Sequence, residues 1–376
     1  MPAIGEVKIP GGKLVRVTVA DAAGTRTCHI DGDFFAAGER SSAAVIAQAE
    51  EALAGRLSAL DAPGVAIEPW YRATVRALEP IVERALIGAN AESIALATLR
   101  AYAQRAPEPF AQALARFEGE RNARIHRQWQ AAQHGEHPQP PLIDPREVRE
   151  RWRALAPVLV EDCPRMPEEQ MRVEREWSRQ VAHGARPATL RVWDWGAPAV
   201  VCGAYQSIED EVHLDQARAR GVHVVRRDSG GGAMVIEPAR TITVSLYAPL
   251  GFVQGLDVAQ SFQLCDMWLI EGLRACGVRA RFAGLNDIAG PHGKIGGSAQ
   301  QRVPGEPGCI LHHTTLAYSI DARAMGAVLN TSAEKMSDKA VKSAAKRVEP
   351  ICAGTRLTRA QVVARLVRTA RAFGAV

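Results

Sequence analysis

Three consecutive glycines between two expected strands constrain the fold of this chain most. The run Arg226-Arg227-Asp228-Ser229-Gly230-Gly231-Gly232-Ala233 separates apolar stretches at 223–225 and 241–246. Glycine accepts positive φ and lets a ligand approach the backbone closely. The N–H groups of such a loop, with two arginines beside them, form a concave site for anions. The run therefore predicts a site for a carboxylate or phosphate group, although a glycine cluster by itself is also typical of an ordinary turn.

The length of the chain predicts more than one domain. Its 376 residues exceed what one hydrophobic core usually supports. A polar stretch and a cluster of prolines set residues 116–150 apart as a connector. We therefore expect a first domain over 1–115, a linker over 116–150 and a second domain over 151–376. For three histidines in the connector, a solvated segment is favoured over a metal site: His126, His134 and His137.

The composition is that of an ordinary globular protein, with 47% apolar and 23% charged residues. Neither a signal peptide nor a membrane span is apparent, so we expect no membrane association. Seven cysteines without CxxC spacing do not indicate a disulfide framework, and a reducing cytoplasm is expected. The net charge of +5 is modest, and we expect no nucleic-acid partner.

Apolar periodicity predicts an α+β fold. Strands are expected within 9–35, and helices over about 41–55 and 70–87. In the second part of the chain, the expected elements are helices over 167–181 and 257–276 and strands over 190–195, 199–206 and 241–247. The last strand alternates hydroxyl and aliphatic side chains, which predicts one exposed face. Strands that mostly follow strands are typical of mixed or antiparallel sheets.

Three further motifs follow the glycine loop in a fixed order. They are Gly284-Leu285-Asn286-Asp287-Ile288, then His292-Gly293-Lys294-Ile295-Gly296-Gly297-Ser298-Ala299-Gln300, then Gly308-Cys309-Ile310-Leu311-His312-His313-Thr314-Thr315-Leu316. Together with the loop they resemble the RRxSGGGA, NDI, GKKIxGSA and HHGTLL motifs of the lipoate–protein ligase family, relatives of the biotin–protein ligases. The resemblance runs from about residue 185 to 350. It implies a biotin/lipoate ligase-like catalytic domain, and the pattern over 11–55 is similar to the family's small accessory domain.

The resemblance implies a reaction in two steps. In the family, the carboxylate of lipoate or octanoate attacks the α-phosphate of ATP, with Mg²⁺, to give an acyl-adenylate and pyrophosphate. A lysine of a lipoyl acceptor domain then displaces AMP. The implied acceptors are the E2 subunits of 2-oxoacid dehydrogenases and the H protein of the glycine cleavage system. Both steps develop negative charge on oxygen, so fixed donors in a dry site should supply much of the acceleration.

The resemblance also implies roles for individual residues. Lys294 corresponds to the family's catalytic lysine, and Asp287 to a ligand of Mg²⁺. The positions implied to contact the adenylate or the acyl chain are Arg227, Ser229, Gly230, Gly231, Gly232, Ala233, Asn286, Asp287, Ser298, Ala299 and His313. For Lys294 the plain alternative is a solvated lysine, and for Asn286 and Asp287 it is a turn Asn-Asp pair. His312, next to His313, is interpreted as an ordinary strand histidine with its hydrogen bonds satisfied. The acyl chain needs an apolar slot, for which Val201, Gly203, Tyr205 and Val235 are candidates.

Two departures from the family pattern leave the substrate open. Residues 236–240 replace a His-Asp-x-Gly-Asn segment, and Thr314 replaces a glycine. An octanoyl or lipoyl transferase with a cysteine nucleophile and no ATP is the second hypothesis. Its cysteine would precede the lysine motif, where this chain has Ala280-Arg281-Phe282, and Cys276 and Cys309 are expected to be buried. A non-catalytic protein that binds acyl-adenylate or the acceptor is the third.

Four lysines with helical spacing form one candidate acceptor surface: Lys335, Lys339, Lys342 and Lys346. A basic stripe would attract acidic lipoyl domains, although a solvated helix face has the same pattern.

Overall fold

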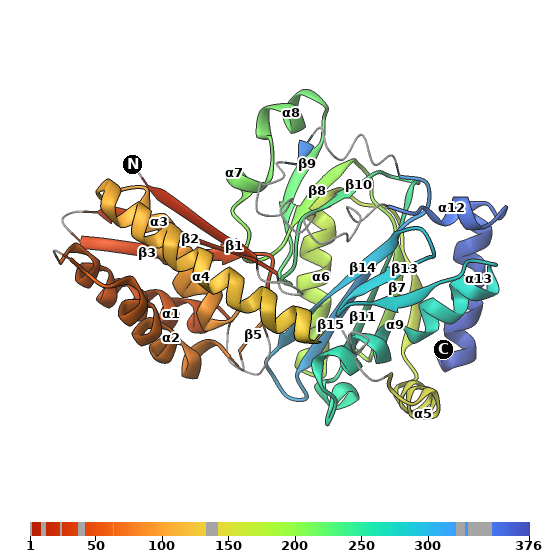
Figure 1. The fold of residues 1–376 in the computed structure, drawn as a ribbon. Helices are drawn as coiled ribbons and strands as arrows, with labels where there is room; N and C mark the ends of the chain where they lie inside the picture. Colours follow the sequence, from red (N-terminus) through yellow and green to blue (C-terminus); the bar gives the residue numbers. More distant parts are fainter. Residues whose placement is uncertain are drawn as a thin grey trace. The chain divides into compact units, whose positions relative to one another are not determined.

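The computed structural model describes residues 2–8, 13–22, 25–36, 42–62, 64–83, 85–132, 142–320, 328–329 and 348–376 (Figure 1). The chain divides into two compact units, with the boundary between Pro138 and Gln139. Both units combine helices with sheets, which confirms the expected α+β class.

A three-stranded antiparallel sheet and four long helices form the first unit. The sheet order is β1 (Ala3–Lys8), β2 (Leu14–Ala22), β3 (Thr25–Gly32), and a short ladder joins β4 (Phe35–Ala36) to β5 (Leu86–Ile87). The helices are α1 (Ser42–Leu57), α2 (Ile67–Val82), α3 (Ala91–Ala103) and α4 (Glu108–Ala132). Helix α3 lies against β1 and β2 because its apolar face, with Ile94 and Ala97, is fully buried there.

Helix α4 begins before the expected connector and continues into it. Residues 116–132 are helical, and the division into functional domains stays a prediction. Contacts with neighbouring helices hold α4 in place. Phe117 lies edge-on to Tyr71 of α2, and Glu118 accepts from Arg100 of α3 at 2.7 Å. A polar helix with one packed face has the same composition as a linker, so composition does not distinguish the two.

A seven-stranded mixed sheet forms the centre of the second unit. Its order is β12 (Arg281–Ala283), β13 (Asp287–Ala289), β14 (Lys294–Val303), β15 (Cys309–Ala317), β11 (Thr241–Ala248), β7 (Thr189–Trp193), β6 (Val158–Glu161). Only β6 and β7 pair in parallel within it. A smaller sheet has the order β10 (Met234–Ile236), β8 (Ala199–Cys202), β9 (His223–Arg226).

The two faces of the large sheet differ in what covers them. On one face, which we call the core face, aliphatic residues pack against α5 (Pro145–Leu155), α9 (Val258–Ala275) and α13 (Arg359–Phe373). On the opposite face, the site face, lie α6 (Pro167–Ala182) and the smaller sheet. Met171 of α6, Trp193, Trp195 and Val201 form a separate apolar cluster there.

Strand β11 corrects one expectation. All eight of its residues are buried, whereas the alternation of hydroxyl and aliphatic side chains predicted an exposed face. Its hydroxyl groups face α6 and two tryptophans, to which they are hydrogen-bonded. A polar strand face can therefore be buried when neighbouring elements supply its partners.

None of the described helices combines the length and the apolar content that crossing a bilayer requires. All seven cysteines are free.

Candidate functional site

Strand register brings the candidate residues together in two rows on the site face. Directly paired residues share a face of a sheet. The first row contains Asp287, Gly297, Thr315, Thr243 and Trp193, from β13 to β7. The second row, two residues along each strand, contains Ala299, His313, Ser245 and Arg191. Neighbouring rows lie roughly 7 Å apart, so the two rows can contact one ligand.

Lys294 and Asp287 form an ion pair at the end of the first row. The Lys294 Nζ atom lies 2.7 Å from Asp287 Oδ1, and about a third of the lysine side chain is exposed. Gly297 makes this arrangement possible, because a Cβ atom there would lie 2.7 Å from Lys294 Nζ. Gly297 thus leaves room for the Lys294 side chain over its own strand. The paired ammonium group is partly open to solvent and available to an anion.

Asn286 and Ser298 join β13 to β14. Ser298 donates its N–H to Asn286 O at 2.9 Å, and Asn286 Nδ2 donates to Ser298 O at 2.6 Å. The Ser298 hydroxyl faces the core face, where it donates to Asp266 of α9. The structure therefore does not bring the Ser298 side chain together with Lys294, whereas Ala299 lies on the site face opposite His313.

The glycine loop turns its carbonyl groups inward. Arg227 is buried, and its Nη2 donates to Gly230 O at 2.7 Å and to Gly232 O at 3.0 Å. In a trans peptide the N–H points opposite to the C=O. The N–H groups of Gly231 and Ala233 therefore point away from Arg227, as an anion site requires. Arg227 shapes the loop from inside, and its contact with a ligand, which the resemblance implies, stays a prediction.

Two glycines allow this loop conformation. Gly231 has a φ of 97°, which favours glycine. Gly203 lies under the loop, and a Cβ atom there would lie only 2.0 Å from Gly231 O. Arg226, the exposed neighbour of Arg227, donates to the carbonyl oxygens of Gly203, Ala204 and Gln206.

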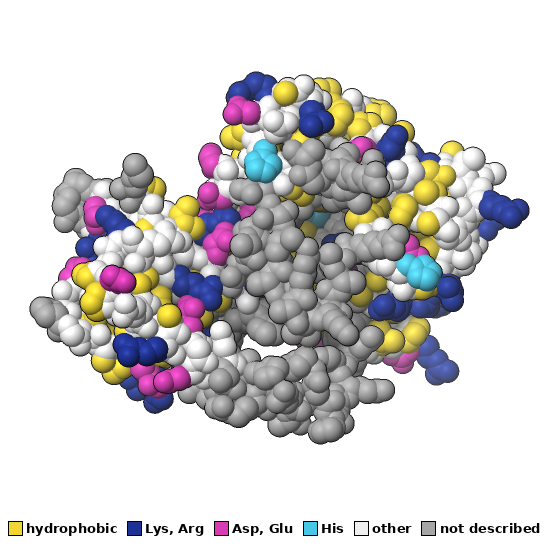
Figure 2. Space-filling model, turned by 45° about the horizontal axis from the view of Figure 1, so that its top comes forward, with side chains coloured by type: hydrophobic (Ala, Val, Ile, Leu, Met, Phe, Trp, Pro, Cys, Tyr) yellow, Lys and Arg dark blue, Asp and Glu magenta, His cyan; other side chains and the backbone are white. Residues whose placement is uncertain are grey.

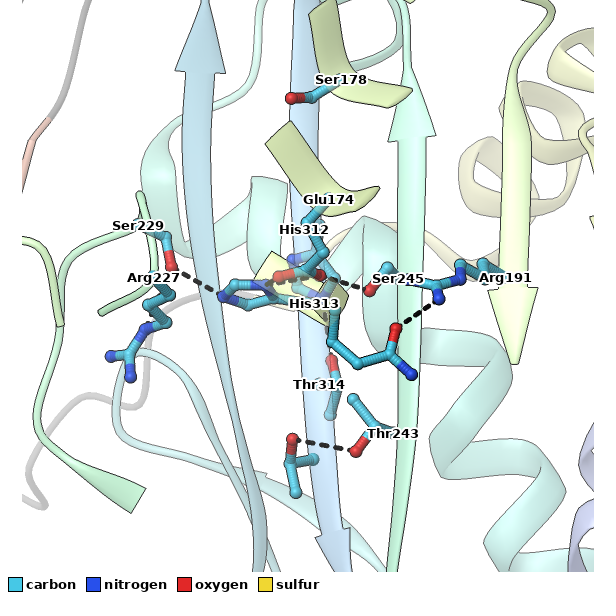
Figure 3. Close-up of polar contacts among 12 residues, drawn as sticks. Glu174, Ser178, Arg191, Arg227, Ser229, Thr243, Ser245, His312, His313 and Thr314 are labelled. Carbon is cyan, nitrogen blue, oxygen red and sulfur yellow. Dashed lines mark hydrogen bonds and ion pairs between the residues drawn. The ribbon is translucent and has the colours of Figure 1, made fainter. Parts of the chain in front are cut away.

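His313 connects the loop to α6. Ser229 Oγ and His313 Nε2 lie 2.6 Å apart, and His313 Nδ1 lies 3.0 Å from Glu174 Oε1 (Figure 3). Ser245 donates to the same carboxylate at 2.7 Å. We call Ser229, His313, Glu174 and Ser245 the His313 chain. No sequence motif includes Glu174, and the only signal for it is a carboxylate at a helix position that faces the interior.

The pKa of Glu174 lies below its ordinary value. Burial alone would raise it, but the attraction of His313, the hydrogen bonds from His313 and Ser245, and the charge of Arg191 outweigh burial. Glu174 is therefore an acceptor-only carboxylate at neutral pH.

His312, the preceding residue, points to the core face. His312 Nε2 lies 2.9 Å from Asp266 Oδ1, and its Nδ1 lies 3.0 Å from Gln300 Nε2. Thr314 Oγ1 donates to the same Asp266 oxygen at 2.7 Å. We call Asp266, Ser298, Gln300, His312 and Thr314 the His312 cluster. Thr314, which departs from the family's glycine, fills this cluster and leaves the site face unchanged.

Two candidates for the acyl slot, Val201 and Val235, lie on opposite faces of the small sheet. Val201 lies in the cluster between the two sheets, with Trp193 and Trp195. Val235 packs on the other side of the small sheet, with Val200 and Cys202. These two residues therefore do not line one slot.

Buried thiols are poor nucleophiles in this chain. Cys276 and Cys309 are buried as expected, and burial raises the pKa of both thiols, that of Cys309 to about 12. Two cysteines are exposed, Cys163 and Cys352. Cys352 follows Glu349 by three residues, and the Glu349 N–H donates to Lys294 O at 2.9 Å.

Some expectations fall outside the described residues. They include the four lysines of the basic stripe (Lys335, Lys339, Lys342 and Lys346), His134, His137 and the side chain of His126. Among the residues that the structure does describe, no group of three or more His, Cys, Asp or Glu side chains could hold a metal ion.

Comparison with known proteins identifies the family. Residues 166–371 match the model of the lipoyl protein ligase A/B catalytic domain, and the chain belongs to this family. The octanoyltransferase LipM of Kyrpidia tusciae is 30% identical over 183 residues, which are 42% of this chain and 65% of that protein. The lipoate-protein ligase A subunit 1 of Thermoplasma acidophilum is 29% identical over 157 residues, 40% of this chain and 58% of the relative. The chain thus spans less than two thirds of these relatives.

One solved structure aligns with part of the chain. The bipartite lipoate protein ligase of T. acidophilum, solved in a study of it and its E2 lipoyl domain, aligns with a TM-score of 0.48 and 25% identity. The alignment covers 58% of this chain and 83% of that one.

Proposed function

We propose that this protein is an ATP-dependent lipoate–protein ligase that activates lipoate or octanoate as acyl-AMP and transfers the acyl group to a lysine of a lipoyl domain. The observation that carries the proposal is that a partly exposed lysine and a loop with outward N–H groups lie on one sheet face. Both groups stabilise negative charge on oxygen. A transfer that passes through a phosphate-activated acyl group needs both of them.

The chain's own residues divide the task. Lys294 would lie against the carboxylate and the α-phosphate as their charge redistributes, leaving Asp287 for a divalent cation. Magnesium in nucleotide sites is commonly bound through one or two carboxylates together with substrate phosphates. A single carboxylate that exchanges its lysine partner for Mg²⁺ fits that donor set, and the cation would supply charge neutralisation of the phosphates. The loop N–H groups would orient the acyl-phosphate.

A transferase that uses a cysteine and no ATP is the second candidate, supported by similarity to proteins named octanoyltransferase. In this chain the position before the lysine motif holds Arg281, which is exposed on β12. A thiol mechanism would therefore need an exposed cysteine elsewhere, and Cys352 follows the segment that pairs with Lys294.

Pyrophosphate release decides between the two. The purified protein would be mixed with ATP, Mg²⁺ and either lipoate or octanoate, and in parallel with an octanoyl thioester in the absence of ATP. The ligase releases pyrophosphate in the first mixture, and its transfer is unchanged by Cys352→Ser. Transfer from the thioester without ATP, lost in Cys352→Ser but retained in Cys163→Ser, would instead establish the transferase. A protein that binds acyl-adenylate yet gives neither product is the non-catalytic binder.

We further propose that the first unit assists this reaction as an accessory domain, in the cytoplasm, where ATP is available and the seven free cysteines stay reduced. Its acceptors would be E2 lipoyl domains and the glycine cleavage H protein. On the face drawn in Figure 2, basic and acidic side chains of the described residues are scattered among apolar ones. Truncation before Gln139 tests the role of the unit: residues 139–376 should remain folded but ligate more slowly, and undiminished rates in both steps would contradict the proposal.

A further inference from the structure

The hydrogen bonds around Glu174 have one direction. Trp193 Nε1 can only donate, and it donates to Ser245 Oγ at 2.9 Å. The Ser245 hydroxyl then donates to Glu174 Oε1 at 2.7 Å. Because an ionised carboxylate only accepts, the nitrogen of His313 that faces Glu174, Nδ1, must carry a proton.

The same logic fixes the other end of the chain. Arg227 Nε donates to Ser229 Oγ at 3.1 Å, so the serine oxygen is already an acceptor. Among the described residues, the acceptor within reach of the Ser229 hydroxyl is His313 Nε2 at 2.6 Å, so the hydroxyl donates to this nitrogen. With a proton on Nδ1 and Nε2 as the acceptor, His313 satisfies every group from Trp193 to Arg227. His312 has the opposite form, because Gln300 Nε2 donates to its Nδ1 and Asp266 accepts from its Nε2.

Ser229 resembles the serine of a Ser-His-acid triad in its distances, but its surroundings differ. The residue is 1% exposed, and its oxygen accepts from a buried arginine. Its backbone carbonyl accepts from the Ala204 N–H at 2.9 Å. Ser229 is thus enclosed at the base of the loop, next to the glycines whose N–H groups face outward.

We propose that Glu174 is a positioning residue: it holds His313 in the Nδ1–H form, and His313 in turn fixes the Ser229 hydroxyl and the conformation of the Gly230–Gly232 loop. This inference deepens the proposed function, since the loop is the anion site on which that function rests. Glu174 lies on α6 and, among the described residues, is joined to the loop through His313 and Ser229.

Glu174→Gln tests the first step in the full chain. The substitution keeps size and shape. Because Ser245 donates to the Oε1 position, the amide oxygen should stay there and the NH₂ group should take the Oε2 position, 3.1 Å from His313 Nδ1. Nδ1 should then become the acceptor and Nε2 should gain the proton. ¹⁵N NMR of the imidazole rings measures this directly. We expect His313 to exchange its protonated nitrogen while His312 stays unchanged as an internal control. Glu176→Gln, the same change at an exposed position of the same helix, should alter neither.

The loop provides the second readout. In Glu174→Gln, amide hydrogen exchange of residues 229–232 should accelerate about tenfold, the effect of one hydrogen bond. Ser229→Ala should accelerate it similarly, and Glu174→Gln should add nothing further in that background, because the two residues act in series. If the protein releases pyrophosphate, variants with faster loop exchange should have higher KM values for lipoate and ATP. The rise in KM should be larger than the fall in kcat.

Unchanged His313 nitrogens in a folded Glu174→Gln protein would overturn the inference, as would additive effects of the two substitutions on loop exchange. A covalent acyl adduct on Ser229 would also overturn it, because the serine would then be a nucleophile. Neither NMR nor exchange depends on catalysis. A protein without pyrophosphate release but with the expected NMR changes would reject the proposed function and retain this inference.

Discussion

His312 and His313 are neighbours on β15, yet they belong to two differently built polar regions. Each histidine pairs with a buried carboxylate, Asp266 on the core face and Glu174 on the site face. The partners in the His312 cluster come from α9, β14 and β15, which are regular elements with fixed spacing. The His313 chain ends instead in a loop, at Ser229.

This difference shows that one buried polar network stabilises the fold, whereas the other positions residues of the site. A network enclosed by helices and strands has all its partners set by the core, so its loss should lower stability without altering the site. A network that ends in a loop fixes the conformation of loop residues that would contact a ligand. Loss of a loop-directed member should therefore affect binding more than the free energy of unfolding.

The largest expected effect lies on the site face. Lys294→Ala should reduce acyl-adenylate formation by about 10²–10³-fold, because the ammonium group stabilises charge that develops in the transition state. Pyrophosphate release measures the loss, and the melting temperature should stay near that of the unmodified protein, since the side chain is partly exposed. Near-normal release by a folded Lys294→Ala protein would remove the residue from the catalytic role.

A substitution on the core face should lower the stability of the protein rather than its reaction rate. Asp266→Asn replaces a carboxylate that accepts from Ser298, His312 and Thr314. We expect a loss of about 1–3 kcal/mol in the free energy of unfolding, because a buried donor is left without an acceptor. Chemical denaturation measures it, with the exposed Asp215→Asn as control. If Asp266→Asn lowered the rate but left stability unchanged, the division between the faces would be wrong.

A smaller change tests the residue that departs from the family pattern. Thr314→Val keeps the shape of the side chain and removes one donor to Asp266. Stability should fall by about 0.5–1.5 kcal/mol, the usual contribution of one hydrogen bond. Because Thr314 faces the core, the KM for lipoate should not change, and a changed KM would show that the two faces communicate.

The smallest effect concerns pH. Burial would raise the pKa of Asp162, but hydrogen bonds from Arg165 and the charge of Arg191 outweigh it and lower this pKa from 3.8 to about 2. A lowered pKa contributes stability that is fully present above about pH 4 and is lost as the pH falls toward 2. Asp162→Asn should therefore destabilise the protein at pH 7, by under about 1 kcal/mol given its partial exposure. The difference from the unmodified protein should shrink by pH 3 in urea titrations, and a constant difference would exclude this carboxylate.

Much of the fold could be predicted because its signals are local. The period of apolar residues predicted α9 over 257–276, and the structure places it at Val258–Ala275. The helix over 167–181 is α6, Pro167–Ala182. The strand over 241–247 was placed correctly but expected to be half-exposed, because alternation shows which residues share a face and not what covers that face.

For the candidate site, too, local sequence signals predicted one part and tertiary contacts decided the rest. The sequence by itself determined the site candidates Lys294, Asn286 and Asp287, since they lie in motifs that resemble those of the family, and the structure joins Lys294 to Asp287. Only the tertiary structure decided that Arg227 points inward, that the Ser298 hydroxyl belongs to the core face, and that Glu174, 139 residues before His313, is its partner. Spacing along a strand determines which side chains point to the same face of the sheet. Contacts between distant segments depend instead on strand register and on helix packing, and no local sequence pattern encodes either.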